Sequence, residues 1–255
     1  MVVSTAPRPG RTPARRSGAA RRRTGDHPSW RRSELSYQSA APANATAAAR
    51  HALTDKLRLD NMTNGFRKKS TMKIATLGRG TIGGTLARLW AQAGHNVTTL
   101  GRDGGDVSDA EVVLVAVLSE AVPDALARVT GLEGKIVLDA TNRMAAAPPA
   151  GYASIAEYIK AQTGGPTAKV FNLNFGALLE QAAETAPKPG NIWVGDEGAR
   201  VAVEQLTRGI GMEPLHAGPL ELASAAETFA LMLVNIVRDL DQGLLYYRFA
   251  PPQSF

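Results

Sequence analysis

The chain has 255 residues, a formal net charge of +6 and no cysteine. This length suits one large domain or two small ones, and the lack of cysteine excludes a disulfide framework and a thiolate metal site. Any redox chemistry would therefore have to come from a bound cofactor.

The positive charge belongs to one end of the chain. Residues 1–71 hold fifteen Lys and Arg against four Asp and Glu, whereas the remaining residues hold fourteen against nineteen. This leader is rich in Arg, Ala and Pro and poor in large apolar residues, which predicts disorder. Three interpretations stay open: a nucleic-acid or membrane arm, a transit peptide, or a mispredicted start ahead of a true beginning at Met72. For the acidic remainder we expect no nucleic-acid partner.

No run of about 18 apolar residues occurs, and the leader lacks the apolar h-region of a secretory signal. We therefore expect a soluble, cytoplasmic protein that does not associate with membranes. From Met72 onward, apolar runs of strand length alternate with helical stretches, a pattern typical of a parallel sheet with crossover helices. The expected strands are residues 73–78, 96–101, 111–117, 135–140, 168–173, 191–195 and 212–218. The expected helices lie near residues 82–94, 120–129, 152–162, 176–184, 197–209 and 220–241.

The first four strands are nearly continuous in Val, Ile and Leu, which indicates burial on both faces. The sequence thus predicts an α/β fold over residues 72–255, with a single doubly wound Rossmann-type parallel sheet. Only about nine residues separate the second strand from the third, where a full Rossmann half would insert a helix and a strand. We therefore expect an abbreviated first half.

A glycine motif follows the first strand and opens the first helix. Gly78, Gly80 and Gly83 form G-x-G-x-x-G in the context that dinucleotide binding requires. In that motif the first glycine allows a tight turn, the second lets pyrophosphate approach the backbone, and the third lets the helix pack closely on the sheet. Free N–H groups at the start of the helix then face the anion.

The end of the second strand indicates which dinucleotide is bound. NAD-binding proteins place an acid there on the ribose 2′-hydroxyl, but here Gly101 takes that place and Arg102 offers a planar fork suited to a 2′-phosphate. Arg79 in the glycine loop adds a second positive charge, whereas Asp103 would restore an acid if the register slipped by one residue. The sequence favours NADP.

Six segments of residues 72–255 are GRGTIGGTLARLWAQAGHNVTTLGR, VVLVAVLSEAV, GKIVLDATN, AKVFNLNFG, WVGDEGA and GMEPLHAGPL. In this order and spacing they resemble the NADPH-dependent coenzyme F420 reductase family, including its short bacterial type. The resemblance implies direct hydride transfer between nicotinamide C4 and C5 of a deazaflavin, with coenzyme F420 as co-substrate. It implies cofactor-binding roles for residues of the glycine loop and of the strand ends. These are Gly78, Arg79, Gly80, Thr81, Ile82, Gly83, Gly101, Arg102, Val117, Ala121, Asn142 and Gly176.

Within that set, the resemblance places Asn142 and Gly176 near the nicotinamide and puts Asn172 at the junction of the two rings. The chain departs from the family at Leu118, where proline is common, and at Leu173, where threonine often follows the asparagine. These departures leave other acceptors open, namely a flavin, a quinone or an imine. A non-catalytic NADP sensor is a further alternative.

Titratable groups at the strand ends are few, and we assign no residue to acid–base catalysis and none to a metal. His95 precedes the second strand and His216 lies in the last one, and we interpret both as structural. Asp139 ends a buried strand, where it could order Thr141 or act as a base. Hydride transfer between two rings needs positioning and exclusion of water rather than proton transfer, and Asn172 could orient a carboxamide or a ring carbonyl.

The last predicted helix is apolar on more than one face. Leu222, Phe229, Leu233, Ile236 and Leu240 recur at helical intervals, as in a core helix. The additional apolar residues leave little polar face, so we expect a homodimer contact there. The aromatic tail after this helix either caps a ring pocket or docks the chain terminus.

Overall fold

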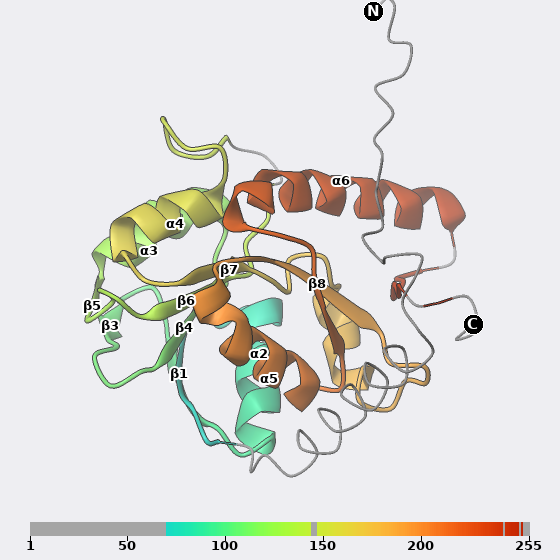
Figure 1. Cartoon of the computed structure of the whole chain (residues 1–255), viewed down its shortest axis with the longest axis horizontal. Helices are drawn as coiled ribbons and strands as arrows, with labels where there is room; N and C mark the ends of the chain where they lie inside the picture. Colours follow the sequence, from blue (N-terminus) through green and yellow to red (C-terminus); the bar gives the residue numbers. More distant parts are fainter. Residues whose placement is uncertain (1–69, 144–146, 242, 250, 252–255) are drawn as a thin grey trace, which may run out of the picture. The chain divides into compact units, whose positions relative to one another are not determined.

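A seven-stranded sheet organises the part of the chain that the structure describes (Figure 1). The computed structural model describes residues 70–143, 147–241, 243–249 and 251, and all of these belong to one compact unit, residues 67–255. The predicted leader lies outside the described residues, apart from positions 70 and 71. The division of the chain at Met72 therefore stays a prediction.

The strands lie in the order β2–β1–β4–β6–β7–β8–β9. Their bounds are β1 (Lys73–Leu77), β2 (Asn96–Leu100), β4 (Val112–Val115), β6 (Ile136–Asp139), β7 (Thr167–Lys169), β8 (Gly190–Gly195) and β9 (Glu213–His216). All neighbouring pairs are parallel except β7 and β8. The α/β, doubly wound prediction is confirmed, but with one antiparallel pair.

Helices connect the parallel strands, because a parallel pair requires a crossover. These connecting helices are α2 (Thr81–Gln92), α3 (Val122–Ala127), α4 (Ile155–Thr163) and α5 (Arg200–Gly209), and α6 (Ala223–Leu240) follows the last strand. Short 3₁₀ helices accompany them: η1 (Ser119–Ala121), η2 (Gly176–Gln181), η3 (Glu197–Ala199) and η4 (Leu220–Leu222). The chain between β7 and β8 contains η2 but no α-helix, which agrees with the antiparallel pairing of these two strands.

The first half of the sheet is abbreviated, as the sequence predicts. After β2 the chain returns directly to β4 on the other side of β1, so β2 is the edge strand. The returning segment forms the two-residue strand β3 (Gly105–Asp106), which pairs with β5 (Val129–Thr130) in a separate small sheet. The return itself contains no helix, and Gly101 and Arg102 at the end of β2 line the cavity described below.

Two predicted elements differ from the structure. The strand expected over residues 168–173 ends at Lys169, because the backbone turns at Phe171, where φ is +63°. The helix expected over residues 176–184 is the 3₁₀ helix η2. Both differences place irregular backbone directly after the carboxyl end of β7.

Apolar side chains fill both faces of the sheet. On one face Leu114 packs with Trp90 of α2 and Leu206 of α5, and on the other Val113 packs with Ile159 of α4. Adjacent strand residues point to opposite faces, so the continuous apolar runs supply both layers. This arrangement confirms the predicted burial on both faces for β1, β4 and β6. The same prediction is wrong for β2, an edge strand in which no residue is buried.

Helix α6 is only partly covered within the described unit. Ala223, Glu227 and Ala230 are buried, whereas apolar side chains along the helix are exposed, including Leu231, Met232, Ile236 and Leu240. By length and composition alone, residues 220–240 could cross a membrane, with a mean hydropathy of 1.6 and 28% of the apolar window buried. Core helices pass the same test.

The aromatic tail docks onto the domain. The Tyr246 hydroxyl donates to the Leu178 carbonyl oxygen at 2.6 Å, and the Tyr247 hydroxyl accepts from the Ile192 N–H at 2.9 Å. Neither tyrosine lines the cavity described below.

Candidate cofactor-binding site

A cavity of about 930 Å³ lies at the carboxyl ends of β1, β4 and β6. Ligands bind at this edge in open α/β sheets. Ten of the twelve residues predicted to bind a cofactor line it: Gly78, Arg79, Gly80, Thr81, Ile82, Gly101, Arg102, Val117, Ala121 and Asn142. Gly83 and Gly176 do not line it.

The three glycines of the motif have different local geometry. Gly78 has a φ of +109°, and a Cβ there would lie 2.4 Å from the Ala116 carbonyl oxygen. A Cβ on Gly83 would lie 2.3 Å from the Gly78 carbonyl oxygen, so this glycine permits close packing of α2, and its predicted contact with a cofactor stays a prediction. A Cβ on Gly80 would meet nothing within 4 Å. The space above Gly80 therefore belongs to the cavity.

Helix α2 begins at this open position. Gly80 is its N-cap and supplies no side-chain hydrogen bond to the first turn. The first N–H groups of a helix have no partner within the helix, and together with the helix dipole they form a site for an anion. The glycine loop, the open space and the uncapped helix together fit a pyrophosphate.

Gly176 adjoins the same loop from η2. A Cβ on Gly176 would lie 2.7 Å from Thr81 Cγ2 and 3.0 Å from Ile82 Cδ1. This glycine therefore allows η2 to approach the start of α2. Its predicted approach to a nicotinamide stays a prediction.

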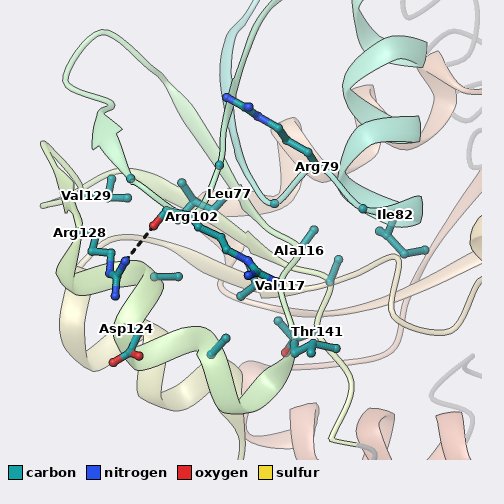
Figure 2. Close-up of a pocket in the computed structure, with 18 of the residues that line it drawn as sticks. Leu77, Arg79, Ile82, Arg102, Ala116, Val117, Asp124, Arg128, Val129 and Thr141 are labelled. Atoms are coloured by element: carbon teal, nitrogen blue, oxygen red, sulfur yellow. Dashed lines mark hydrogen bonds between the residues drawn. The ribbon is translucent and has the colours of Figure 1, made fainter.

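Three arginines line the cavity, and their side chains diverge (Figure 2). The Arg79 guanidinium packs over Gly101, where a Cβ would lie 3.3 Å from Arg79 Cζ, and donates to the Thr99 carbonyl oxygen at 3.1 Å. Arg102 follows Gly101. The Arg128 guanidinium donates to the Arg102 carbonyl oxygen at 3.2 Å. An acid in place of Gly101 would displace Arg79 or pair with it.

The electrostatic character of this end is positive. Within the described residues, none of these three arginines forms an ion pair with a carboxylate. Asp124 lines the cavity, whereas the exposed Asp103 does not. Asp103, the acid that a one-residue shift in register would have placed at the ribose, is therefore not part of the cavity wall. Arg128, which sequence reasoning missed, belongs to no motif and reaches the site from the end of α3.

At another part of the cavity, two asparagines hold each other. Asn142 Nδ2 donates to the Asn172 carbonyl oxygen at 2.6 Å, and Asn172 Nδ2 donates to Asn142 Oδ1 at 3.1 Å. Asn142 lines the cavity, but Asn172 is buried and does not. The predicted orienting role of Asn172 would therefore act through Asn142.

Asp139 is engaged on both carboxylate oxygens. Oδ1 accepts from the Thr141 N–H at 2.8 Å, as one sequence interpretation expected, and Oδ2 accepts from Lys169 Nζ at 2.8 Å. These bonds assign Asp139 to ordering the loop after β6. Sequence reasoning missed Lys169, because a lysine inside an apolar strand gives no sign of its partners.

The two histidines of the folded region lie outside the cavity wall. His95 Nδ1 accepts from the Met72 N–H at 3.1 Å, and the His216 ring lies against Trp193, with 4.2 Å between ring centroids. These contacts agree with structural roles. Among the described residues, no group of three or more His, Cys, Asp or Glu could hold a metal ion.

No family model matches this sequence, and no curated protein matches it. Among solved structures, the fold is similar to a provisionally assigned F420-dependent NADP reductase from Arthrobacter sp. FB24. The two chains share 23% identity at a TM-score of 0.61, over 71% of this chain and 100% of the other.

The fold is also similar to an imine reductase from Pseudomonas sp., with 17% identity and a TM-score of 0.51, over 68% of this chain and 64% of the other. A reductive aminase from Aspergillus terreus, in complex with NADPH, shares 18% identity at a TM-score of 0.50, over 68% and 63% of the two chains. At these identities the comparisons establish the Rossmann-type fold.

Proposed function

We propose that the protein is an NADP-dependent oxidoreductase. One observation carries this proposal: the same cavity is lined by the open glycine loop and by three arginines that have no carboxylate partner among the described residues. It is also lined by Gly101, at the position where NAD-binding proteins place an acid. When bound, NADPH supplies the hydride. Thr81 and Ile82 N–H groups would hold the pyrophosphate, and Arg102 with Arg128 would hold the 2′-phosphate.

The chain's own residues would bind and orient rather than move protons. Val117 and Ala121 form an apolar part of the cavity wall. The hydrogen bonds between Asn142 and Asn172 fix the orientation of the Asn142 amide in the same wall. Such a site contributes by orientation and by exclusion of water. This chemistry fits a reaction in which hydride passes directly between two rings.

As acceptor we propose a deazaflavin of the coenzyme F420 type. The family resemblance supports it, and the provisional assignment of the Arthrobacter protein agrees with it. A second candidate is a different acceptor, namely an imine, a flavin or a quinone. The observation that favours it is Leu118, which replaces the family's common proline, lines the cavity and is 71% exposed.

An acceptor panel tests the proposal. Purified protein and NADPH are mixed separately with coenzyme F420, FMN, a quinone and a cyclic imine, and the loss of NADPH absorbance is followed. Turnover with coenzyme F420 alone supports the deazaflavin proposal, whereas turnover with another acceptor alone supports the second candidate. Tight NADPH binding without turnover would contradict both and would favour a sensor.

We further propose a homodimer through α6. Met232, Ile236 and Leu240 are exposed at intervals of four residues and form one apolar stripe. Glu227, in the first half of α6, is buried inside the protomer, whereas Arg238 and Asp239 are exposed beside the carboxyl end of the stripe. A self-complementary surface of this kind suits a two-fold axis. The cytoplasmic location stays a prediction.

Light scattering at micromolar concentration tests this dimer. We expect the mass of two chains for the wild type and of one chain for Met232→Glu combined with Ile236→Lys. A matched control is Val201→Glu, because Val201 is an exposed apolar residue on α5. A wild type with the mass of one chain would contradict the proposal.

A further inference from the structure

A buried ion cluster lies behind the cavity wall formed by residues 140–142. Lys169 Nζ donates to Asp139 Oδ2 at 2.8 Å, to Glu227 Oε1 at 3.0 Å and to Thr141 Oγ1 at 3.2 Å. The Lys169, Asp139 and Glu227 side chains are 0% exposed. The cluster joins the ends of β6 and β7 to α6, and Thr141 is its member that also lines the cavity.

The ammonium determines the role of the Thr141 hydroxyl. An ammonium group has three donors and no acceptor, and all three are used in this cluster. Thr141 Oγ1 must therefore accept from Lys169, and its single hydrogen has to be donated elsewhere. Among the described residues, the structure shows no hydrogen bond donated by this hydroxyl, although its oxygen accepts from Lys169.

The position of Thr141 indicates where the hydrogen is used. Thr141 lies in the cavity wall with Val117, on the other side of the cavity from Arg128 (Figure 2). If the 2′-phosphate lies at Arg102 and Arg128, the nicotinamide half lies toward Thr141 and Asn142. A carbonyl oxygen of the carboxamide is an acceptor that fits a hydroxyl donor.

We propose that Lys169 is a positioning residue, which holds the Thr141 hydroxyl as a hydrogen-bond donor to the nicotinamide carboxamide oxygen. This inference rests on the proposed NADP-binding function and assigns one ligand atom to one side chain. Thr141 is the residue that touches the cofactor, and Lys169 acts through it. No proton is transferred in this arrangement.

The test compares two ligands by calorimetry. NADPH carries the nicotinamide, whereas 2′,5′-ADP keeps the 2′-phosphate half and lacks it. A neutral hydrogen bond contributes about 0.5–1.5 kcal/mol, so Thr141→Val should weaken NADPH binding roughly three- to tenfold. The affinity for 2′,5′-ADP should not change, and Thr141→Ser, which retains the hydroxyl, should bind NADPH like the wild type.

Thr163→Val is the matched control. Thr163 is a buried threonine of α4, whose hydroxyl donates to the Ile159 carbonyl oxygen, so its loss should leave both affinities unchanged. An equal loss for both ligands in Thr141→Val, or no loss, would overturn the inference. Failure of the wild type to bind either ligand would instead overturn the proposed function, and the two failures are thereby distinguished.

The role of Lys169 is tested in a second background. Lys169→Met alone would leave the buried Asp139 and Glu227 carboxylates without their ammonium partner, so it is combined with Asp139→Asn and Glu227→Gln. In this background the hydroxyl is no longer held by an ammonium, and adding Thr141→Val should change NADPH affinity less than twofold. An undiminished effect of Thr141→Val would contradict the role of Lys169. If this triple variant does not fold, the comparison of Thr141→Val with Thr141→Ser decides whether the hydroxyl contacts the nicotinamide half.

Discussion

Replacing Arg102 with alanine probes the selection of NADP at the end of β2. Hydrogen bonds to charged groups contribute about 1.5–3 kcal/mol. Because Arg102 is exposed, solvent screens its interaction with a phosphate, and we take the lower end of that range. NADPH affinity should therefore fall roughly tenfold. NADH lacks the 2′-phosphate, so its affinity should not change.

Isothermal calorimetry with both dinucleotides measures this difference. Arg88→Ala is the matched control, because Arg88 is an arginine of α2 that pairs with Glu180 outside the cavity wall. Arg128→Ala should weaken NADPH in the same direction, since Arg128 also donates to the Arg102 carbonyl oxygen. An equal loss for NADH and NADPH in Arg102→Ala, or no loss for either, would refute the assignment of this end to the 2′-phosphate.

Four further predictions concern the glycine loop, the core and the docked tail. Gly80→Ala should leave the melting temperature nearly unchanged but weaken the binding of NADPH and NADH alike, because the new Cβ enters the space for the pyrophosphate. Gly78→Ala should destabilise the fold by about 1–3 kcal/mol, since its Cβ would meet the Ala116 carbonyl oxygen at 2.4 Å. Thr76→Val should stabilise the fold by about 1 kcal/mol in denaturant unfolding, because the buried Thr76 hydroxyl has no partner. Burial raises the pKa of Tyr247. The protonated Tyr247 hydroxyl therefore contributes its full stabilisation below about pH 10, and the free energy of unfolding declines at higher pH by up to about 1.4 kcal/mol per pH unit. Tyr247→Phe should reduce this decline.

Each of these has a result that would count against it. An unchanged free energy of unfolding in Gly78→Ala would show that the loop accommodates a Cβ there. A lowered melting temperature in Gly80→Ala would show that the position is structural. Destabilisation by Thr76→Val would mean that its hydroxyl has a partner. An alkaline decline that is identical in Tyr247→Phe and the wild type would assign the decline to other groups.

Local patterns predicted the sheet and one half of the site. The apolar runs place β1, β4 and β6 within about two residues of their observed ends, because strands buried on both faces need continuous apolar side chains. The predicted bounds of the edge strand β2 also agree, although none of its residues is buried. The glycine motif locates the phosphate loop because its backbone geometry excludes a Cβ at Gly78 and Gly83. The short link after β2 correctly indicates a missing strand.

The remaining features depend on contacts between distant residues. Arg128 reaches the Arg102 carbonyl across 26 positions, and Lys169 meets Glu227 across 58, so neither partnership has a local signature. The antiparallel β8 was not predicted, since a strand's own side chains do not encode its direction. The irregular backbone after β7 was predicted as regular structure, because the turn at Phe171 places a large apolar residue at positive φ, against its local preference.

The central claim is that this cavity binds NADP by its 2′-phosphate. The most direct measurement is calorimetric titration of the wild-type protein with NADPH and with NADH under the same buffer and salt. We expect one site per chain and at least tenfold tighter binding of NADPH, because the cavity offers guanidinium groups and no acid in place of Gly101. Equal affinities, tighter binding of NADH, or no binding of either dinucleotide would contradict the account.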